Sequence, residues 1–198
     1  KVALRELDHR TMNNFQLSAA VLRSQSQRSG QTEVTAALSG AVDRLLVLAA
    51  LHRRLDYANA SLGRRPLAPL LNEIVGALEG HRSNDAIAIA TEFADVDVTH
   101  DTALRMGLIA NELVTNALKH AFPHGTGRID VRVELQGTTL ALTVSDDGIG
   151  LPHMPVPGGG SSLVTSLAKS IGATITRQSS GGTTVTVKLP LGEGCDGA

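Results

Sequence analysis

IANELVTNALKHAF, residues 109–122, is the stretch from which the fold of this 198-residue chain is predicted. Its apolar residues recur at three- and four-residue steps, which indicates an amphipathic helix. Glu112, Asn116 and His120 are spaced four residues apart, so they share one face of that helix. Oxygen ligands such as Glu112 and Asn116 suit magnesium, and the neighbouring Lys119 suits phosphate. A solvated surface stripe is the alternative interpretation.

A second motif, VSDDGIGLP, residues 144–152, follows a run with the alternation of a strand. Gly148 and Gly150 let the backbone pass close to a flat ligand, and the Asp146 carboxylate can accept a hydrogen bond from an exocyclic amine. An acidic turn after a strand is the alternative. A dinucleotide-binding fingerprint is excluded, because Pro152 and a loop stand where a helix should begin.

A third motif, PGGGSSLVTSLAKSIGA, residues 157–173, leads three glycines into a helix that Ser161 or Ser162 could cap. Free N–H groups at such a helix start attract phosphate, although a glycine linker is an equally simple interpretation. The pattern GxxxxGK[ST] does not occur in the chain, so a P-loop is excluded.

The chain before these motifs has a different pattern. Apolar residues follow the helical period over residues 4–28 and again over residues 32–57, with Ser29-Gly30 between them. Two helices joined by a short break predict an antiparallel hairpin, which buries its second face in a dimeric four-helix bundle. The segment 60–69, rich in Gly, Pro and Arg, is the expected boundary.

Beyond the boundary, helical and strand patterns alternate irregularly. Helices are expected at 70–78, 102–120 and 161–171, and strands at 86–93, 127–135, 139–145, 173–178 and 183–190. The two central strands predict a hairpin around Gln136-Gly137. This order predicts an α+β domain, an α/β sandwich with helices packed on one face of a mainly antiparallel sheet.

In this order, the three motifs resemble the N, G1 and G2 boxes of the Bergerat-type ATP-binding fold, which gyrase, a class of heat-shock chaperones and histidine kinases share. SGGTTVTVKLP, residues 180–190, is similar to the closing strand of that fold. The resemblance implies ATP and Mg²⁺ as ligands, with Asn116 holding the metal and Glu112 assisting it or polarising the reaction centre. It further implies Lys119 and His120 near phosphate oxygens, Asp146 at the adenine amine, Thr183 near the adenine, and Gly148, Gly150, Gly158 and Gly160 around the pocket and its lid.

LRELDHRTMNNFQ, residues 4–16, resembles the phosphoacceptor box, usually HHRxKNNxQ, of the HisKA-2 or HWE-like sensor histidine kinases. His9 lies about 140° around the helix from Leu4, away from the apolar stripe, so its imidazole is expected to face solvent. The resemblance implies that His9 accepts a phosphoryl group. Asp8 is the nearest carboxylate that could draw the second ring proton, and Asn13 could orient a phosphate or a water.

The resemblance covers nearly the whole chain and implies the core of a sensor histidine kinase in a two-component system. Such a protein phosphorylates itself on His9 with ATP and passes the phosphoryl group to an aspartate of a response regulator receiver domain. The expected organisation is a dimerisation and phosphoacceptor hairpin at 1–61, a catalytic ATP-binding domain at 62–192 and a flexible tail at 193–198. The hairpin is expected to form the homodimer.

The motifs depart from the family pattern in three places. Asp8 replaces the first histidine of the box, Thr11-Met12 replaces its middle, and GGGSS stands where GLGL is common. A histidine phosphotransfer or scaffold protein with a degenerate ATP-binding domain is therefore the alternative function. In a third interpretation, an ATPase or serine kinase of the same nucleotide fold, His9 has no role.

The composition of the chain limits its possible partners and cellular location. A net charge of -1, a pI near 6.7 and 2% aromatic residues predict no nucleic-acid partner. The only cysteine, Cys195, permits neither a disulfide nor a cysteine metal site within one chain, which fits the cytoplasm. The apolar stretch 45–51 is too short for a membrane span and no signal peptide precedes it, so no membrane contact is expected. Because the chain begins with Lys1 rather than Met, we expect a fragment of a longer protein.

Overall fold

A computed structural model describes three continuous stretches of the chain, 63–80, 86–150 and 161–191, and some of the positions between residues 17 and 42. The chain divides into two compact units, Lys1–Gly63 and Arg64–Ala198. Several residues of the expected sites lie outside the described residues. These are Asp8, His9 and Asn13 of the phosphoacceptor box and Gly158 and Gly160 of the lid.

In the first unit, helical positions occur on both sides of Gln31, which is itself not helical. The Ser26 hydroxyl donates to the carbonyl of Thr35 at 3.3 Å, and the Thr35 hydroxyl donates to the carbonyl of Ser26 at 3.2 Å. These two residues lie on opposite sides of the break. Their hydrogen bonds join helical positions before Gln31 to helical positions after it.

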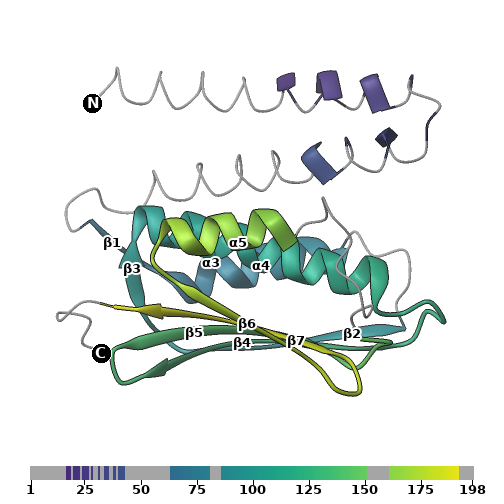
Figure 1. Ribbon diagram of the computed structural model, residues 1–198. Helices are drawn as coiled ribbons and strands as arrows, with labels where there is room; N and C mark the ends of the chain where they lie inside the picture. The colour runs from purple at the N-terminus through teal and green to yellow at the C-terminus, as the bar shows by residue number, and fades with distance from the viewer. Residues whose placement is uncertain are drawn as a thin grey trace. The chain divides into compact units, whose positions relative to one another are not determined.

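The second unit has two layers, with helices on one face of a five-stranded sheet (Figure 1). This is the α/β sandwich expected from the sequence. None of the helices in the described stretches is long and apolar enough to cross a membrane. The elements are β1 (Arg64–Pro66), α3 (Leu67–Gly80), β2 (Ile87–Phe93), β3 (Asp97–Thr99), α4 (His100–His120), β4 (Gly127–Gln136), β5 (Thr139–Asp146), α5 (Ser161–Ser170), β6 (Thr174–Ser179) and β7 (Thr183–Pro190).

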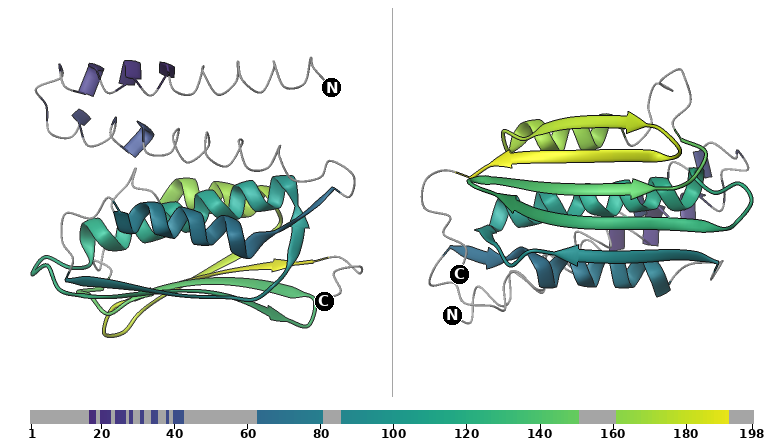
Figure 2. Two further views of the ribbon diagram at one scale, coloured as in Figure 1. Left: turned by 180° about the vertical axis from the view of Figure 1, so that it is seen from behind. Right: turned by 90° about the horizontal axis from the view of Figure 1, so that it is seen from below.

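The strands of the large sheet lie in the order β2-β4-β5-β7-β6 (Figure 2). The pairs β4–β5, β5–β7 and β6–β7 are antiparallel, which confirms the predicted hairpin and the antiparallel strands that follow it. β2 pairs with β4 in parallel, so the sheet is mixed at this edge. The parallel pair follows from the chain path, because α4 lies between β2 and β4 in sequence and returns the chain in the same direction.

A small two-stranded sheet, β1 with β3, was not predicted. Arg64 pairs with Thr99, and the backbone N–H of Leu67, at the start of α3, donates to the carbonyl of Val96 at 3.0 Å. The division between the two units, after Gly63, falls within the segment 60–69, and from Arg64 onward this segment forms β1 and the start of α3. Three-residue strands carry too little alternation to be recognised, and the pairing partner of β1 lies far along the chain.

The core of the second unit lies between the helices and the large sheet. Ile129 and Val131, two residues apart on β4, are 0% exposed. Met106, Ala110 and Val114, four residues apart on α4, are also 0% exposed. Both spacings are those that the sequence predicts, since strand side chains alternate between faces and helix side chains return after three or four residues.

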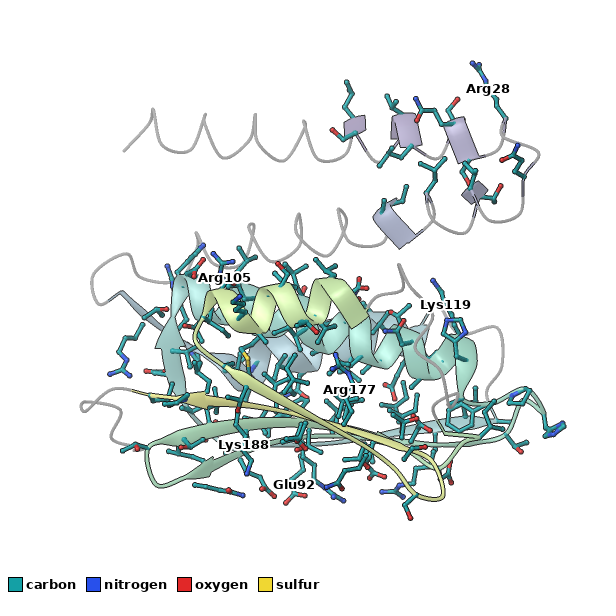
Figure 3. The ribbon with its side chains drawn as sticks, in the orientation of Figure 1. Arg28, Glu92, Arg105, Lys119, Arg177 and Lys188 are labelled. Carbon is teal, nitrogen blue, oxygen red and sulfur yellow. The ribbon has the colours of Figure 1, made fainter. Side chains whose placement is uncertain are left out.

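The opposite face of the large sheet is polar. The Arg132 guanidinium lies 3.4 Å from Glu92 and 3.7 Å from Asp130, and Arg128 lies 2.7 Å from Asp130. Glu92 projects from this face in Figure 3, away from the helices. Apart from the half-buried Asp130 these groups are exposed, so the ion pairs contribute little to stability and leave the face as solvated surface.

The start of α4 is capped and joined to α5. The backbone N–H of Thr102 donates to the Thr99 hydroxyl at 3.2 Å, which is an N-cap. Arg105 donates at 2.7 Å to the carboxylate of Asp101, which lies in the first turn of α4. Arg105 also donates to the Ser170 hydroxyl at 2.8 Å, at the end of α5.

The Arg105–Asp101 pair predicts a pH-dependent contribution to stability. Its hydrogen bond lowers the pKa of Asp101 below the usual value. A carboxyl group with a lowered pKa stabilises the fold above its unfolded pKa of about 3.9, and this contribution disappears as the pH falls through the folded pKa. We expect Asp101→Asn to reduce the free energy of unfolding by about 0.5 kcal/mol at pH 7, since the pair is largely exposed. Denaturant titrations at pH 7 and pH 3 check this, and an equal difference at both pH values would contradict it.

Candidate functional site

The polar stripe of α4 changes in exposure along the helix. Glu112 is 6% exposed, Asn116 is half-buried and His120 is exposed. Lys119 is exposed at the C-terminal end of α4 (Figure 3). A solvated stripe would leave Glu112 in water, so the surface interpretation fails for this carboxylate.

The C-terminal end of α4 contacts the acidic loop, which we define as residues Asp146–Gly150. The backbone N–H of Ile149 donates at 2.9 Å to the carbonyl of Ala121, the residue that caps α4. Gly148 packs on the same residue, because a Cβ on Gly148 would overlap the carbonyl and the side chain of Ala121. These contacts bring the first and second sequence motifs together.

Asp146 is held by two backbone N–H groups. Its Oδ1 accepts from the N–H of Gly148 and from that of Thr183, each at 3.1 Å. Thr183 lies directly opposite Asp146 in the register of β5 and β7, so strand pairing fixes the second contact. In the described part of the chain, no donor bonds to Oδ2. Asp146 therefore presents a free acceptor to a ligand.

Close backbone packing around Asp146 requires two of the glycines. Gly182 has φ +130°, and a Cβ there would overlap the carbonyl oxygen of Asp146. Gly150 has φ +78°, and a Cβ there would lie 2.5 Å from the hydroxyl oxygen of Ser179. Residues with a side chain rarely adopt such positive φ values. The glycines thus allow β5, β7 and the acidic loop to meet at one point.

The helix residues of the expected site lie at increasing distances from this point along α4. Lys119 and His120 directly precede Ala121. Asn116 lies five residues before Ala121, which corresponds to about 7.5 Å along the helix axis. Glu112 lies about 6 Å further along the axis. The structure thus brings Asp146, Gly148, Gly150 and Thr183 together beside the end of α4, and leaves Glu112 in the interior.

The described residues contain no group of three or more His, Cys, Asp or Glu side chains that could hold a metal ion. Magnesium in nucleotide sites usually keeps several waters and takes one or two protein ligands together with substrate phosphates. Asn116 offers an amide oxygen at a half-buried position, and Glu112 already has a partner within the protein. The residues present fit a magnesium ion that arrives with phosphates, with Asn116 as the accessible ligand.

Sequence reasoning missed two residues that the structure singles out. Asn111 is 1% exposed and its Oδ1 has no hydrogen-bond partner. The signal was present, because Asn111 and Glu112 are adjacent polar residues in an apolar helix and cannot share one face. The second missed residue is Asp147, whose Oδ1 accepts from the backbone N–H of Arg128 at 2.6 Å. In the sequence, only its place as the second acid of Asp146-Asp147-Gly148 could have drawn attention to it.

Asn111 provides a stability prediction. A buried acceptor without a partner costs about 1 to 3 kcal/mol, and an apolar side chain of similar volume does not have this cost. We therefore expect Asn111→Leu to preserve the free energy of unfolding or to raise it by up to about 2 kcal/mol. Asn111→Asp, which places a charge at the same point, should lower it. Urea denaturation followed by circular dichroism measures both, and a clear loss of stability in Asn111→Leu would show that Oδ1 has a partner.

Comparison with known proteins gives two family matches. Residues 6–81 match the family described as "Histidine kinase". Residues 101–193 match the family described as "Histidine kinase-, DNA gyrase B-, and HSP90-like ATPase". The two matches lie in the order in which the sequence motifs occur, and the second contains every described residue of the candidate site.

Individual proteins agree with these matches. Blue-light-activated histidine kinase 2 of Erythrobacter litoralis is 32% identical over 96% of this chain and 57% of its own length. Sensor histidine kinase PdtaS of Mycobacterium tuberculosis is 32% identical over 76% of this chain and 30% of its own length. The chain thus spans only part of the length of these relatives, 57% of the first and 30% of the second. A solved histidine kinase domain of an Erythrobacter litoralis blue-light activated kinase is similar over 96% of this chain and 95% of its own, with 29% identity and a TM-score of 0.72.

Proposed function

The chain belongs to the sensor histidine kinases with a HisKA-2 phosphoacceptor segment and a Bergerat-type ATP-binding unit, and from this premise we propose that it phosphorylates itself on His9 with ATP. The phosphoryl group then passes to an aspartate on the receiver domain of a response regulator. We assign the phosphoacceptor hairpin to residues 1–61 and the catalytic unit to residues 62–192.

The geometry of Asp146 is the observation that carries this proposal. Two N–H groups hold Oδ1, and Oδ2 remains available at the junction of α4, β5 and β7. A rigid carboxylate with a free oxygen selects a ligand with an exocyclic amine, such as adenine. Gly148 and Gly150 keep the backbone beside it free of side chains, so a flat base can approach.

The end of α4 supplies groups for the phosphates. Lys119 and His120 are exposed there and can contact phosphate oxygens, as Lys commonly does. Asn116 would hold Mg²⁺ together with those oxygens, with Glu112 behind it. When bound, the metal offsets the negative charge that spreads over the transferred phosphoryl oxygens. Gly158 and Gly160 would belong to the lid over the phosphates.

In the proposed reaction, one nitrogen of neutral His9 attacks the γ-phosphorus of ATP. A nitrogen–phosphorus bond forms, the bond from the γ-phosphorus to the bridging oxygen breaks, and ADP leaves. Asp8 draws the proton on the other ring nitrogen and so favours attack. Asn13 orients the phosphoryl group or a water on the same helix face.

A homodimer through the hairpin is part of the proposal. Leu17 and Val21, one helical turn apart, are 70% and 51% exposed, and Val34 is 38% exposed. Apolar side chains at helical spacing that stay exposed in one chain support packing against a second copy. This packing completes the four-helix bundle.

Labelling with ATP tests the proposal. The chain is incubated with γ-labelled ATP and Mg²⁺, and the labelled protein is then treated with acid or alkali. Label that survives alkali and is lost in acid is expected, because phosphohistidine behaves in this way and phosphoserine does the reverse. His9→Ala should abolish it, and His100→Ala, at the opposite end of α4 from Lys119, should keep it.

Two results would contradict the proposal in different ways. A chain that neither takes label nor binds ATP would be a phosphotransfer or scaffold protein. Label that His9→Ala leaves unchanged would indicate an ATPase or a kinase of another residue.

A further inference from the structure

Asp147 lies between Asp146, the proposed adenine-binding residue, and Gly148, the first glycine of the acidic loop. Its side chain is exposed, yet its Oδ1 accepts from the backbone N–H of Arg128 at 2.6 Å. Its own backbone N–H donates to the carbonyl of Arg128 at 3.2 Å. Two hydrogen bonds thus join the acidic loop to the start of β4.

The partner segment is shaped to receive this carboxylate. A Cβ on Gly127, the first residue of β4, would lie 2.9 Å from the Asp147 Oδ1 and would overlap the ring of Phe122. Gly127 is therefore the residue that lets the carboxylate and the ring approach from two sides. The fit indicates a fixed position for Asp147 and not a freely rotating surface carboxylate.

The contact with Arg128 does not depend on its charged group. The Arg128 guanidinium donates to Asp130, at 2.9 Å from Nε and 2.7 Å from Nη2. Asp147 binds the backbone N–H of the same residue. An acceptor oxygen, and not a negative charge, is what the position requires.

Three elements therefore hold the acidic loop, each through a different residue. β7 holds Asp146 through Thr183, β4 holds Asp147 through Arg128, and α4 holds Ile149 through Ala121. Gly148, whose N–H fixes the Asp146 Oδ1, lies between the second and third of these contacts. Losing the Asp147 side chain removes one of the two hydrogen bonds to Arg128 and leaves only the backbone N–H of residue 147 to hold this side of the loop next to Gly148.

We propose that Asp147 is a positioning residue for base recognition, which acts through Gly148 to fix the direction of the Asp146 carboxylate. This inference rests on the proposed function, since it takes Asp146 as the group that reads adenine. Because Asp147 is exposed and outside the core, its loss affects the orientation of the loop more than the stability of the unit. A loop that adopts the productive arrangement only part of the time lowers the apparent affinity by that fraction.

The test compares Asp147→Ala, Asp147→Asn and Arg128→Ala in the full chain. We expect Asp147→Ala to raise the Kd for ATP about tenfold, with little effect on the Kd for GTP and little change in Tm. Asp147→Asn retains an acceptor oxygen and should restore the affinity. Arg128→Ala removes the guanidinium, keeps the backbone N–H and should bind ATP as the unsubstituted chain does. Equilibrium binding gives the two Kd values, and thermal unfolding gives Tm.

Each contrary outcome has a definite meaning. Unchanged ATP affinity in Asp147→Ala, or failure of Asp147→Asn to restore a lost affinity, overturns the positioning role while the proposed function stands. Equal weakening for ATP and GTP with a clear fall in Tm shows a purely structural role. If the unsubstituted chain binds no ATP, the proposed function fails and the inference fails with it.

Discussion

Asp146→Asn is expected to weaken ATP binding by about 100-fold, because a charged hydrogen-bond acceptor is lost and the new amide donor faces the adenine amine, which is also a donor. The amide oxygen can still accept from the N–H groups of Gly148 and Thr183, so the fold should be retained. The amide nitrogen then stands in the place of Oδ2. It donates hydrogen bonds and opposes the exocyclic amine of adenine, which also donates.

The same substitution should change base preference. Guanine carries a carbonyl oxygen where adenine carries its amine, and the new amide group can donate to that oxygen. The preference for ATP over GTP is therefore expected to shrink or reverse. Equilibrium dialysis with each nucleotide measures the two affinities directly.

Asp130→Asn is the matched control for Asp146→Asn. Asp130 is paired with Arg128 on the polar face of the sheet, away from the helices. Its substitution makes the same chemical change and should leave both nucleotide affinities as they were. If Asp146→Asn bound ATP as tightly as this control, Asp146 would not be the group that reads the base.

Gly182→Ala is expected to lower the free energy of unfolding by about 3 kcal/mol or more. Two costs combine at this position. The backbone has φ +130°, which residues with a side chain rarely adopt, and the new methyl group would overlap the carbonyl oxygen of Asp146. Because that oxygen belongs to the backbone of β5, the overlap is removed only if β5 and β7 move apart. Nucleotide affinity should fall as well, since the Thr183–Asp146 contact depends on the same approach.

Gly181→Ala is the control for this prediction. Gly181 has φ +65°, and a Cβ there meets nothing within 4 Å. Only the backbone cost remains, about 1 to 2 kcal/mol. Urea titrations of both variants separate the steric cost from the conformational one. Equal losses in the two variants would show that the contact with Asp146 adds nothing.

Hydrophobic periodicity explains why most of the second unit could be predicted. Ile129 and Val131 alternate with polar residues because one side of β4 faces the helices, and Met106, Ala110 and Val114 repeat because one side of α4 faces the sheet. Each pattern is local and needs no knowledge of the partner. The hairpin of β4 and β5 was equally local, since two residues connect its strands.

The features that escaped prediction depend on contacts between distant segments. β1 is ordered by β3, and the parallel edge of the sheet arises from the path of the chain through α4. The sequence could indicate that Asn111 or Glu112 is buried, but not that the Asn111 Oδ1 lacks a partner, and the role of Asp147 arises only where β4 begins beside the acidic loop. Periodicity shows which face of an element is buried, but not what it is buried against.

The amino-acid sequence alone determined the three helices described in the second unit and the five strands of its large sheet, the family of the chain and the residue types available for nucleotide chemistry. Tertiary structure alone decided that Glu112 is buried and that Asp146 keeps one oxygen free while two backbone N–H groups hold the other. The reason is geometric. The spacing of buried residues can be recognised within one helix or strand, whereas the direction of a carboxylate is set by hydrogen bonds from elements far apart in the chain.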